Sequence, residues 1–308
     1  MNEKIETSSK INWMHLVNPS HEEIEKIADE YDFHELIVDD LTETGTQDKI
    51  DVYDDYLFLV IHFPKFDKVT GRYVHNEFNI VLGKNFIVST SRFNTSQIAK
   101  IKDSFHEDIS EAEPDEKYMN SPYYILYKLV DGMYDKVLKS LSSFTKEVMT
   151  LEDEMFETNM NPKGILEDLV TKRRNSIFLK SIFMPQGEII DELHDSTLKF
   201  FGGEFDVYFE DLAYKIDKIS NQVTNLYQNI GSLADTYNTL TTIETNKTVG
   251  VLTIFTAIVG TMTFVTGLYG MNVKLPLWNF HYAFIAVVWL IIVVASTMIY
   301  YFKKKNRI

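Results

Sequence analysis

Two long stretches without a charged residue, near the C-terminal end, place the strongest constraint on how this chain can fold. One runs from Thr248 to Val273 and the other from Tyr282 to Phe302. A helix needs about 20 consecutive apolar residues to cross the roughly 30 Å hydrocarbon core of a bilayer. The sequence therefore predicts two membrane-spanning helices, at about 248–271 and 282–302, joined by a short outer loop over 272–281. A buried helical hairpin of a soluble protein is the weaker alternative.

Charge is divided unevenly along the 308 residues. Residues 1–244 hold all 45 acidic residues and 24 Lys and Arg, a net charge of −21, whereas residues 245–308 hold six Lys and Arg and no acid, a net charge of +6. An acidic body argues against a nucleic-acid partner, because phosphate binding needs clustered basic side chains. Basic residues follow the second span, and by the positive-inside rule both ends of the chain are expected in the cytoplasm. The expected location is the plasma (inner) membrane.

The first 118 residues have the pattern of a cytoplasmic α/β domain. Ser20 and Glu23 have the spacing of a capping box at the start of a helix. Alternating and β-branched apolar residues, separated by short Gly-containing breaks, predict strands joined by hairpins. The expected strands cover 10–17, 51–66, 72–83 and 85–91, and the expected helices cover 19–31 and 95–107.

Residues 119–247 have the apolar spacing of long helices and form the predicted stalk region. One helix is expected over 122–158, and a second follows Asn161-Pro162 and breaks at Met184-Pro185. A third begins near residue 204 and continues into the first span without a loop, with apolar residues every three or four positions. About 60 helical residues would extend on the order of 90 Å. Such a helix predicts a bundle or an oligomeric stalk, followed by a transmembrane domain over 248–308.

The first span carries a continuous stripe of small and hydroxylated residues at steps of three and four. Its members are Thr253, Thr256, Gly260, Thr263, Gly267 and Gly270, and the stripe continues backwards to Val249 and Asn246. Close packing of helices through small residues explains such a stripe, and a pore lined by several copies of the helix is the alternative. The stripe by itself favours packing. The absence of charged residues within the spans argues against a proton-coupled pump.

The end of the first span reads Tyr269-Gly270-Met271-Asn272. This motif stands before a short loop, and the chain also has a Lys-rich end, a long helix before the motif and an α/β domain. In these features the whole chain resembles the CorA-type magnesium channels of the metal ion transporter superfamily. The resemblance implies a homopentamer with a funnel-shaped cytoplasmic assembly and a pore lined by the first span.

The resemblance also assigns roles to individual residues. The selectivity motif falls on Tyr269, Gly270, Met271 and Asn272, and the pore lining on Asn246, Val249, Leu252, Thr253, Thr256, Gly260, Thr263 and Gly267. Because these positions nearly coincide with the stripe, the resemblance favours the pore. The segment 36–44 implies a regulatory metal ligand at Asp40, with Asp39 beside it, and the segment 207–215 implies the facing acid Asp211, with Asp235 further along the stalk. A basic ring at the inner mouth falls on Lys303, Lys304, Lys305 and Arg307.

Two positions depart from the family pattern. Gly260-Thr261 stands where the family often has Met-Pro in mid-pore, so Leu252 and Val249 would have to supply the hydrophobic constriction. Lys274 stands in the outer loop, where many relatives carry acidic residues. Capture of cations by carboxylates of this loop is therefore not expected.

The expected function is passive, potential-driven transport of magnesium, with cobalt and nickel as further candidate ions. Mg²⁺ would be both the transported ion and the regulatory ligand that closes the channel from inside the cell. No phosphate-binding loop or His-Glu-x-x-His motif is present in the sequence, and no enzymatic activity is expected. Two alternatives stay open: a zinc transporter of the related ZntB type, in which Ile typically replaces Met271, and a membrane-tethered scaffold without transport.

Overall fold

The computed structural model describes seven segments of the chain: 3–6, 11–42, 45–107, 121–157, 161–201, 205–271 and 282–304. The chain divides into two compact units, Met1–Leu233 and Ala234–Ile308.

In the described part of the first unit, six strands form one mixed sheet in the order β1-β2-β6-β5-β4-β3. The strands are β1 (Glu3–Glu6), β2 (Asn12–Val17), β3 (Lys49–Val52), β4 (Tyr56–Asp67), β5 (Arg72–Gly83) and β6 (Phe86–Ser91). Only β2 and β6 pair in parallel among these neighbours. The predicted hairpin between β4 and β5 is confirmed, and Gly71 in its turn adopts a positive φ of 67°, which favours glycine.

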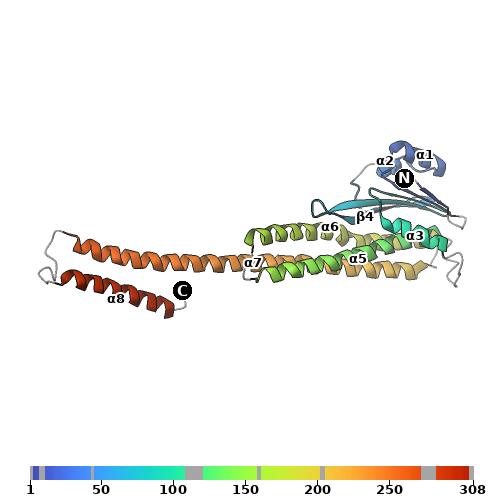
Figure 1. Ribbon diagram of the computed structural model, residues 1–308. Coiled ribbons are helices and arrows are strands. Elements are labelled where there is room, and N and C mark those ends of the chain that lie inside the picture. The colour runs from blue at the N-terminus through green and yellow to red at the C-terminus, as the bar shows by residue number, and fades with distance from the viewer. Residues whose placement is uncertain are drawn as a thin grey trace. The chain divides into compact units, whose positions relative to one another are not determined.

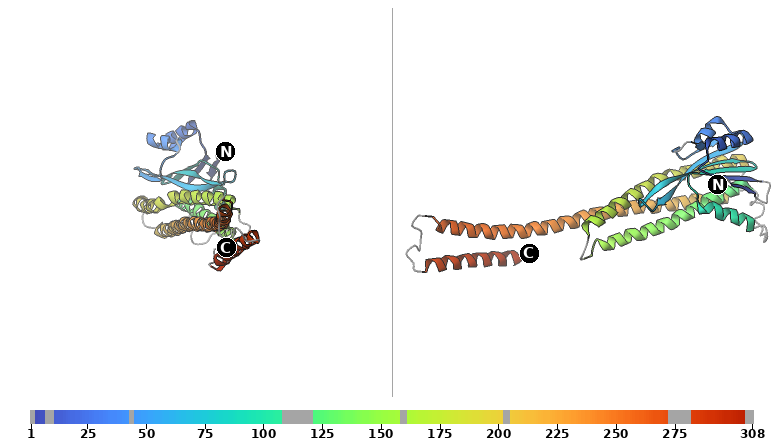
Figure 2. Two further views of the ribbon diagram at one scale, coloured as in Figure 1. Left: turned by 90° about the vertical axis from the view of Figure 1, so that its left-hand side faces the viewer. Right: turned by 45° about the horizontal axis from the view of Figure 1, so that its top comes forward.

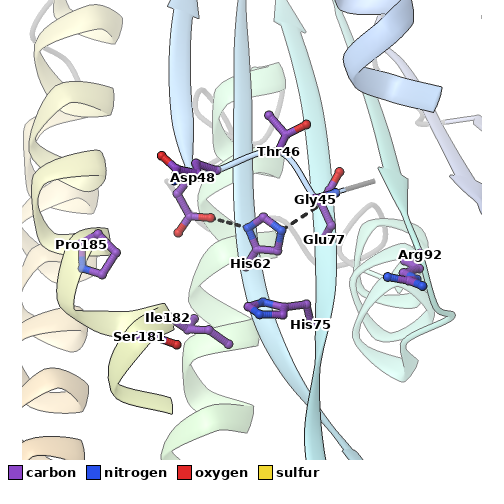
Figure 3. Close-up of a pocket in the computed structure, with 11 residues that line it drawn as sticks. Gly45, Thr46, Asp48, His62, His75, Glu77, Arg92, Ser181, Ile182 and Pro185 are labelled. Carbon is purple, nitrogen blue, oxygen red and sulfur yellow. Dashed lines mark hydrogen bonds and ion pairs between the residues drawn. The ribbon is translucent and has the colours of Figure 1, made fainter. Parts of the chain in front are cut away.

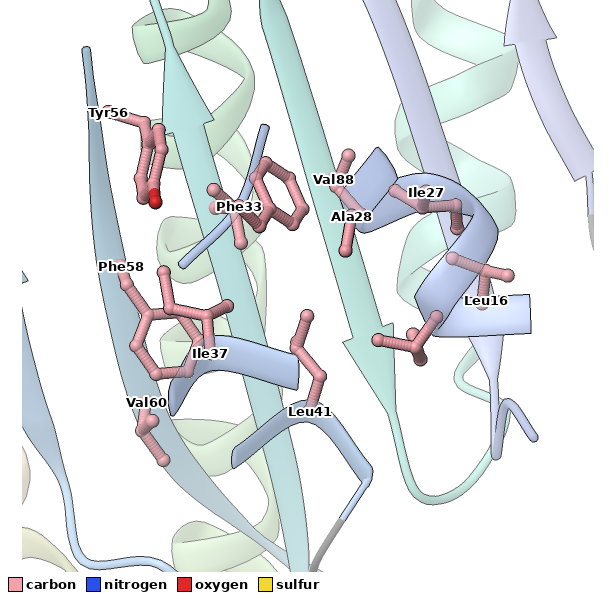
Figure 4. Packing of buried hydrophobic residues seen from close by; sticks show 12 residues of the cluster. Leu16, Ile27, Ala28, Phe33, Ile37, Leu41, Tyr56, Phe58, Val60 and Val88 are labelled. Carbon is pink, nitrogen blue, oxygen red and sulfur yellow. The ribbon is translucent and has the colours of Figure 1, made fainter. Parts of the chain in front are cut away.

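Two short helices, α1 (His21–Tyr31) and α2 (Glu35–Thr42), cover one face of the sheet (Figure 1). The capping box of Ser20 and Glu23 is present at the start of α1, as expected. Apolar side chains from both helices pack on β2, β4, β5 and β6 (Figure 4). The fully or nearly buried members of this cluster include Ile24, Ile37, Phe58, Val60, Val81 and Val88.

The opposite face of the sheet packs on long helices (Figure 2). These are α5 (Pro122–Glu154) and α6 (Pro162–Phe201), with the shorter α3 (Ser96–Glu107) beside α5. The ring of Phe63 on β4 meets the buried ring of Tyr134 on α5 at a centroid distance of 5.6 Å. Gln186 of α6 donates from Nε2 to the carbonyl oxygen of His62 at 2.6 Å, so a buried polar contact ties α6 to the sheet.

Two sequence expectations are corrected, and two elements were not expected. The break at Met184-Pro185 is wrong, because α6 continues through Pro185 to Phe201; the buried side chains beyond it, such as Leu193, hold the helix against its neighbours. The expected strand 51–66 is two strands, because a turn closed by the Tyr53 N–H on the Tyr56 carbonyl separates β3 from β4. Helix α2 and strand β1 were not anticipated.

Helix α7 extends from Asp206 to Tyr269, and α8 covers Ala283–Lys304. The apolar residues that recur every three or four positions in the first part of α7 are buried, as a packed helix requires. They are Leu212, Ile216, Ile219, Val223, Leu226, Ile230 and Leu233. Within the described residues, the C-terminal part of α7 and most of α8 are long and apolar enough to cross a membrane. The predicted continuity of the stalk helix with the first span is thus confirmed.

Candidate functional site

The predicted pore positions lie together along one side of the C-terminal part of α7. All eight are exposed in the chain: Asn246, Val249, Leu252, Thr253, Thr256, Gly260, Thr263 and Gly267. A Cβ added at Gly260 or at Gly267 would meet no atom of the chain within 4 Å. Nothing within the described chain therefore covers this face.

Helix α8 contacts a different side of α7. The side chains between the two helices are Ile258, Thr261, Met262 and Val265 of α7 and Ile291, Val294, Ala295 and Met298 of α8. Thr261 donates from Oγ1 to the sulfur of Met298 at 3.8 Å. At about 100° of rotation per residue, the centre of this contact face lies roughly half a turn around α7 from the stripe. The stripe therefore does not serve to pack the two spans of one chain together.

Each threonine of the stripe donates its hydroxyl hydrogen to the backbone. The Oγ1 atoms of Thr253, Thr256 and Thr263 donate to the carbonyl oxygens of Val249, Leu252 and Val259 at 2.8, 2.5 and 2.9 Å. The lone pairs of these oxygens remain as acceptors, since a hydroxyl has one donor hydrogen and two acceptor lone pairs. The hydroxyl groups of this face thus present acceptors rather than donors.

The predicted selectivity motif begins where α7 ends. Tyr269 is the last helical residue, and the N–H of Gly270 still donates to the Thr266 carbonyl at 2.9 Å. Met271 is exposed, and Asn272 lies outside the described residues. Of the predicted basic ring, Lys303 and Lys304 belong to the last turn of α8, whereas Lys305 and Arg307 lie outside the described residues.

The acids Asp39 and Asp40 lie on α2, at the edge of the helix layer over the sheet. Asp39 is exposed, whereas Asp40 is partly buried and accepts from Lys49 Nζ at 2.7 Å through Oδ2. Lys49 also binds Asp51 at 2.9 Å. Burial lowers the pKa of Lys49, but the hydrogen bonds and charges of both carboxylates outweigh burial and raise the pKa above its usual range. The regulatory acid predicted on α2 therefore already has a cation beside it.

Asp211, on the first part of α7, lies in a cluster of charged groups shared with α5. Tyr127 donates from its hydroxyl to Asp211 Oδ2 at 3.1 Å. Lys215, one turn after Asp211, forms ion pairs with Asp131, with Asp135 at 3.0 Å and with Asp211 at 3.9 Å. Burial raises the pKa of the Asp131 carboxyl, and its bond to Lys215 only partly opposes this. Three carboxylates thus surround one ammonium group.

No contact joins Asp40 to Asp211 among the interactions of the described segments, and Asp235 is an exposed residue further along α7. In the same segments, no group of three or more His, Asp or Glu side chains is placed to hold a metal ion. One chain therefore does not assemble the predicted regulatory site on its own.

A buried cluster that the sequence did not single out lies between the sheet, the segment after α2, and α6 (Figure 3). His62 of β4 binds Asp48 through Nδ1 at 2.5 Å and Glu77 of β5 through Nε2 at 3.3 Å. Burial lowers the pKa of His62, but the two carboxylates outweigh burial and raise it to about 9. The cluster lines a cavity of about 490 Å³ that His75 and Arg92 also border.

The family model described as "CorA-like Mg2+ transporter protein" matches residues 8–304. The chain belongs to this family. It is 24% identical over 301 residues to the cobalt/magnesium transport protein CorA of Thermotoga maritima, covering 97% of this chain and 84% of that protein. The complete structure of the CorA magnesium transporter from Methanocaldococcus jannaschii matches with a TM-score of 0.81 at 18% identity, covering 97% of this chain and 92% of that one.

Membership in the CorA-like family confirms the fold expected from the sequence, an α/β domain with a long helix and two C-terminal apolar helices. It also confirms the expectation of a membrane transporter rather than an enzyme, with its large N-terminal part on the cytoplasmic side. A weaker match is the zinc transport protein ZntB of Yersinia pseudotuberculosis, 19% identical over 48% of this chain and 44% of that protein.

Proposed function

We propose that five copies of this chain form a potential-driven magnesium channel whose pore is lined by the threonine and glycine stripe of α7. The observation that carries this proposal is the place of the stripe. It lies exposed on the side of α7 opposite the contact with α8, and nothing in the described chain covers it. Relatives named as cobalt/magnesium transport proteins support magnesium, and cobalt as a second ion.

The stripe has the chemistry to pass a hydrated cation. Mg²⁺ dehydrates reluctantly, so its bound waters point their hydrogens outwards to the pore wall. The wall must therefore accept hydrogen bonds. Thr253, Thr256 and Thr263 have given their hydroxyl hydrogens to the backbone, and their oxygens are left as acceptors. With glycine at residue 260, the narrowest apolar ring falls to Leu252 and Val249.

Selectivity is assigned to Gly270, Met271 and Asn272 at the outer mouth. A ring of amide oxygens from Asn272 would accept hydrogen bonds from the waters of the ion without holding the metal directly, whereas a carboxylate ring would bind it too tightly for rapid conduction. Entry is driven by the membrane potential, at about 2.3 kcal/mol per charge per 100 mV. The basic ring of Lys303 to Lys305 and Arg307 lies at the inner mouth.

Closure is assigned to Mg²⁺ inside the cell. The ion would bridge Asp40 of one subunit and Asp211 of the next, with Asp39 and Asp235 as further acidic ligands, and so hold the stalks together when internal magnesium is high. The presence of Asp40 and Asp211 on separate elements, without contact in one chain, supports a site built between subunits. The division into an α/β domain (1–118), a stalk region (119–247) and a transmembrane domain (248–308) is part of this proposal.

Uptake of magnesium by cells that lack other magnesium transporters tests the pathway. Asn272→Ala is expected to abolish uptake, and Asn279→Ala, an amide in the same outer loop, is expected to retain it. Equal uptake by the Asn272→Ala and unchanged proteins would show that Asn272 is not the selectivity residue. Asp211→Ala is expected to remove inhibition by internal magnesium, and persistence of that inhibition would exclude Asp211 as a sensor.

Flux in liposomes distinguishes the remaining functions. The purified protein is reconstituted into liposomes, and the flux of Mg²⁺, Co²⁺, Ni²⁺ and Zn²⁺ is measured with the ions in competition. Transport of zinc in preference to magnesium would support the ZntB-type function instead. No flux of any divalent ion from correctly assembled protein would support a membrane-tethered scaffold.

A further inference from the structure

Each of the two acids assigned to the closing site faces an ammonium group of its own chain. Lys49 Nζ lies 2.7 Å from Asp40 Oδ2, and Lys215 Nζ lies 3.9 Å from Asp211 Oδ2. The lysine side chains are 34% and 18% exposed. Both ammonium groups therefore occupy space beside a carboxylate that a regulatory metal ion would need.

Further carboxylates hold each lysine in this place. Asp51 binds Lys49 at 2.9 Å, and Asp131 and Asp135 of α5 bind Lys215. None of these three acids belongs to the proposed closing site. A lysine held by a second partner stays beside the regulatory acid even when that acid is offered another cation, so the competition is built into the fold.

We propose that Lys49 and Lys215 compete with the regulatory Mg²⁺ for Asp40 and Asp211, and thereby set the internal magnesium concentration at which the channel closes. This inference rests on the proposed closing site. A unit positive charge about 6 Å from a divalent cation in water weakens its binding by on the order of tenfold. A chain without the two lysines would close at a lower magnesium concentration than this one.

The full-length protein in liposomes provides the test, with magnesium flux recorded against the magnesium concentration on the stalk side. Lys49→Met and Lys215→Met are each expected to lower the half-closing concentration by on the order of tenfold. Lys49→Arg and Lys215→Arg keep the charge and are expected to close at nearly the same concentration as the unchanged protein. Lys218→Met, at an exposed position of the same helix as Lys215, is the matched control and is expected to cause no shift.

Assembly of each variant is checked by size-exclusion chromatography. Magnesium-dependent protection of the stalk from a protease reports closure without any need for flux. Lys49→Gln and Lys215→Gln replace the Met variants if either fails to assemble, and the same direction of shift is expected from them. An unchanged or higher half-closing concentration in assembled, charge-removing variants overturns the inference.

Asp211→Asn separates the inference from the function on which it rests. If Asp211→Asn closes normally, the proposed closing site is wrong. If Asp211→Asn no longer closes but loss of either lysine leaves the half-closing concentration unchanged, the closing site stands and only the competition by lysine fails.

Discussion

His62 Nδ1 lies 2.5 Å from Asp48 Oδ1, and both side chains are almost withdrawn from solvent, at 10% and 8% exposure. The other ring nitrogen faces Glu77, so both N–H groups of a charged imidazole have a carboxylate to bind. Asp48 belongs to the segment between α2 and β3, whereas His62 and Glu77 belong to the sheet. The charged ring therefore anchors that segment, and with it the end of α2, to the sheet.

We expect the protein to lose stability at alkaline pH because of the His62 cluster. The pKa of His62 is raised to about 9 from an ordinary value of 6.5. The stabilisation is complete below pH 6.5 and is lost as pH rises through 9; a shift of this size corresponds to on the order of 3 kcal/mol. Thermal unfolding of the full-length protein between pH 6 and pH 10 should show the midpoint fall over this range.

His62→Gln is expected to remove most of this pH dependence and to lower the midpoint at pH 7. Two buried carboxylates then lose their cation, and breaking a buried ion pair costs about 3–5 kcal/mol. His75→Gln is the matched control, since His75 borders the same cavity but is exposed and has a lowered pKa, caused first by burial and then by the charge of His62. A pH profile of His62→Gln that parallels the unchanged protein would contradict the charged state of His62.

Substitution of Gly260 distinguishes a pore from a packing surface. A Cβ added at residue 260 meets no atom of its own chain within 4 Å and the position is exposed, so the fold of one subunit should tolerate Gly260→Leu. We expect assembly to persist and magnesium conductance to fall by about tenfold or more, because an added apolar ring in a pore blocks ions by dewetting. Single-channel or liposome flux measurements test this expectation.

Ser296→Leu is the control for Gly260→Leu, because Ser296 is exposed on α8, away from the proposed pore. It is expected to leave conductance unchanged. Loss of the oligomer in Gly260→Leu would instead support the alternative explanation of the stripe, close packing between helices. Normal conductance in an intact oligomer would place residue 260 outside the pathway.

Much of the fold could be predicted because the features that determine it depend on residues close together in the sequence. The capping box of α1, the Gly71 hairpin and the apolar spacing of α7 all act within a few residues of the chain. Helix α2 has only eight residues, and its stability comes from burying Ile37 and Leu41 on the sheet rather than from a signal of its own.

The charged partners could not be predicted in the same way. Lys215 meets Asp131 and Asp135 across 84 and 80 residues of sequence, and His62 meets Glu77 across a hairpin. Their roles depend on which elements pack together. The stripe of α7 was visible in the sequence, but its separation from the contact with α8 required the structure.

Pro185 is the residue for which the sequence prediction failed, and its substitution tests the reason. Proline has no N–H, so the carbonyl of Ser181 loses its helical partner, yet α6 continues because its side chains are buried on both sides of this point. Pro185→Ala restores the missing bond and is expected to stabilise the protein by about 1–2 kcal/mol, after the greater freedom of the unfolded chain is subtracted. Pro162→Ala, at the first position of α6, where the N–H has no helical partner in any case, is expected to change stability little. Thermal unfolding of the full-length variants measures both effects. An unfolding midpoint for Pro185→Ala at or below that of Pro162→Ala would contradict this expectation. Pro185 would then contribute contacts in the cavity beside His62 that stabilise the protein more than the missing hydrogen bond would.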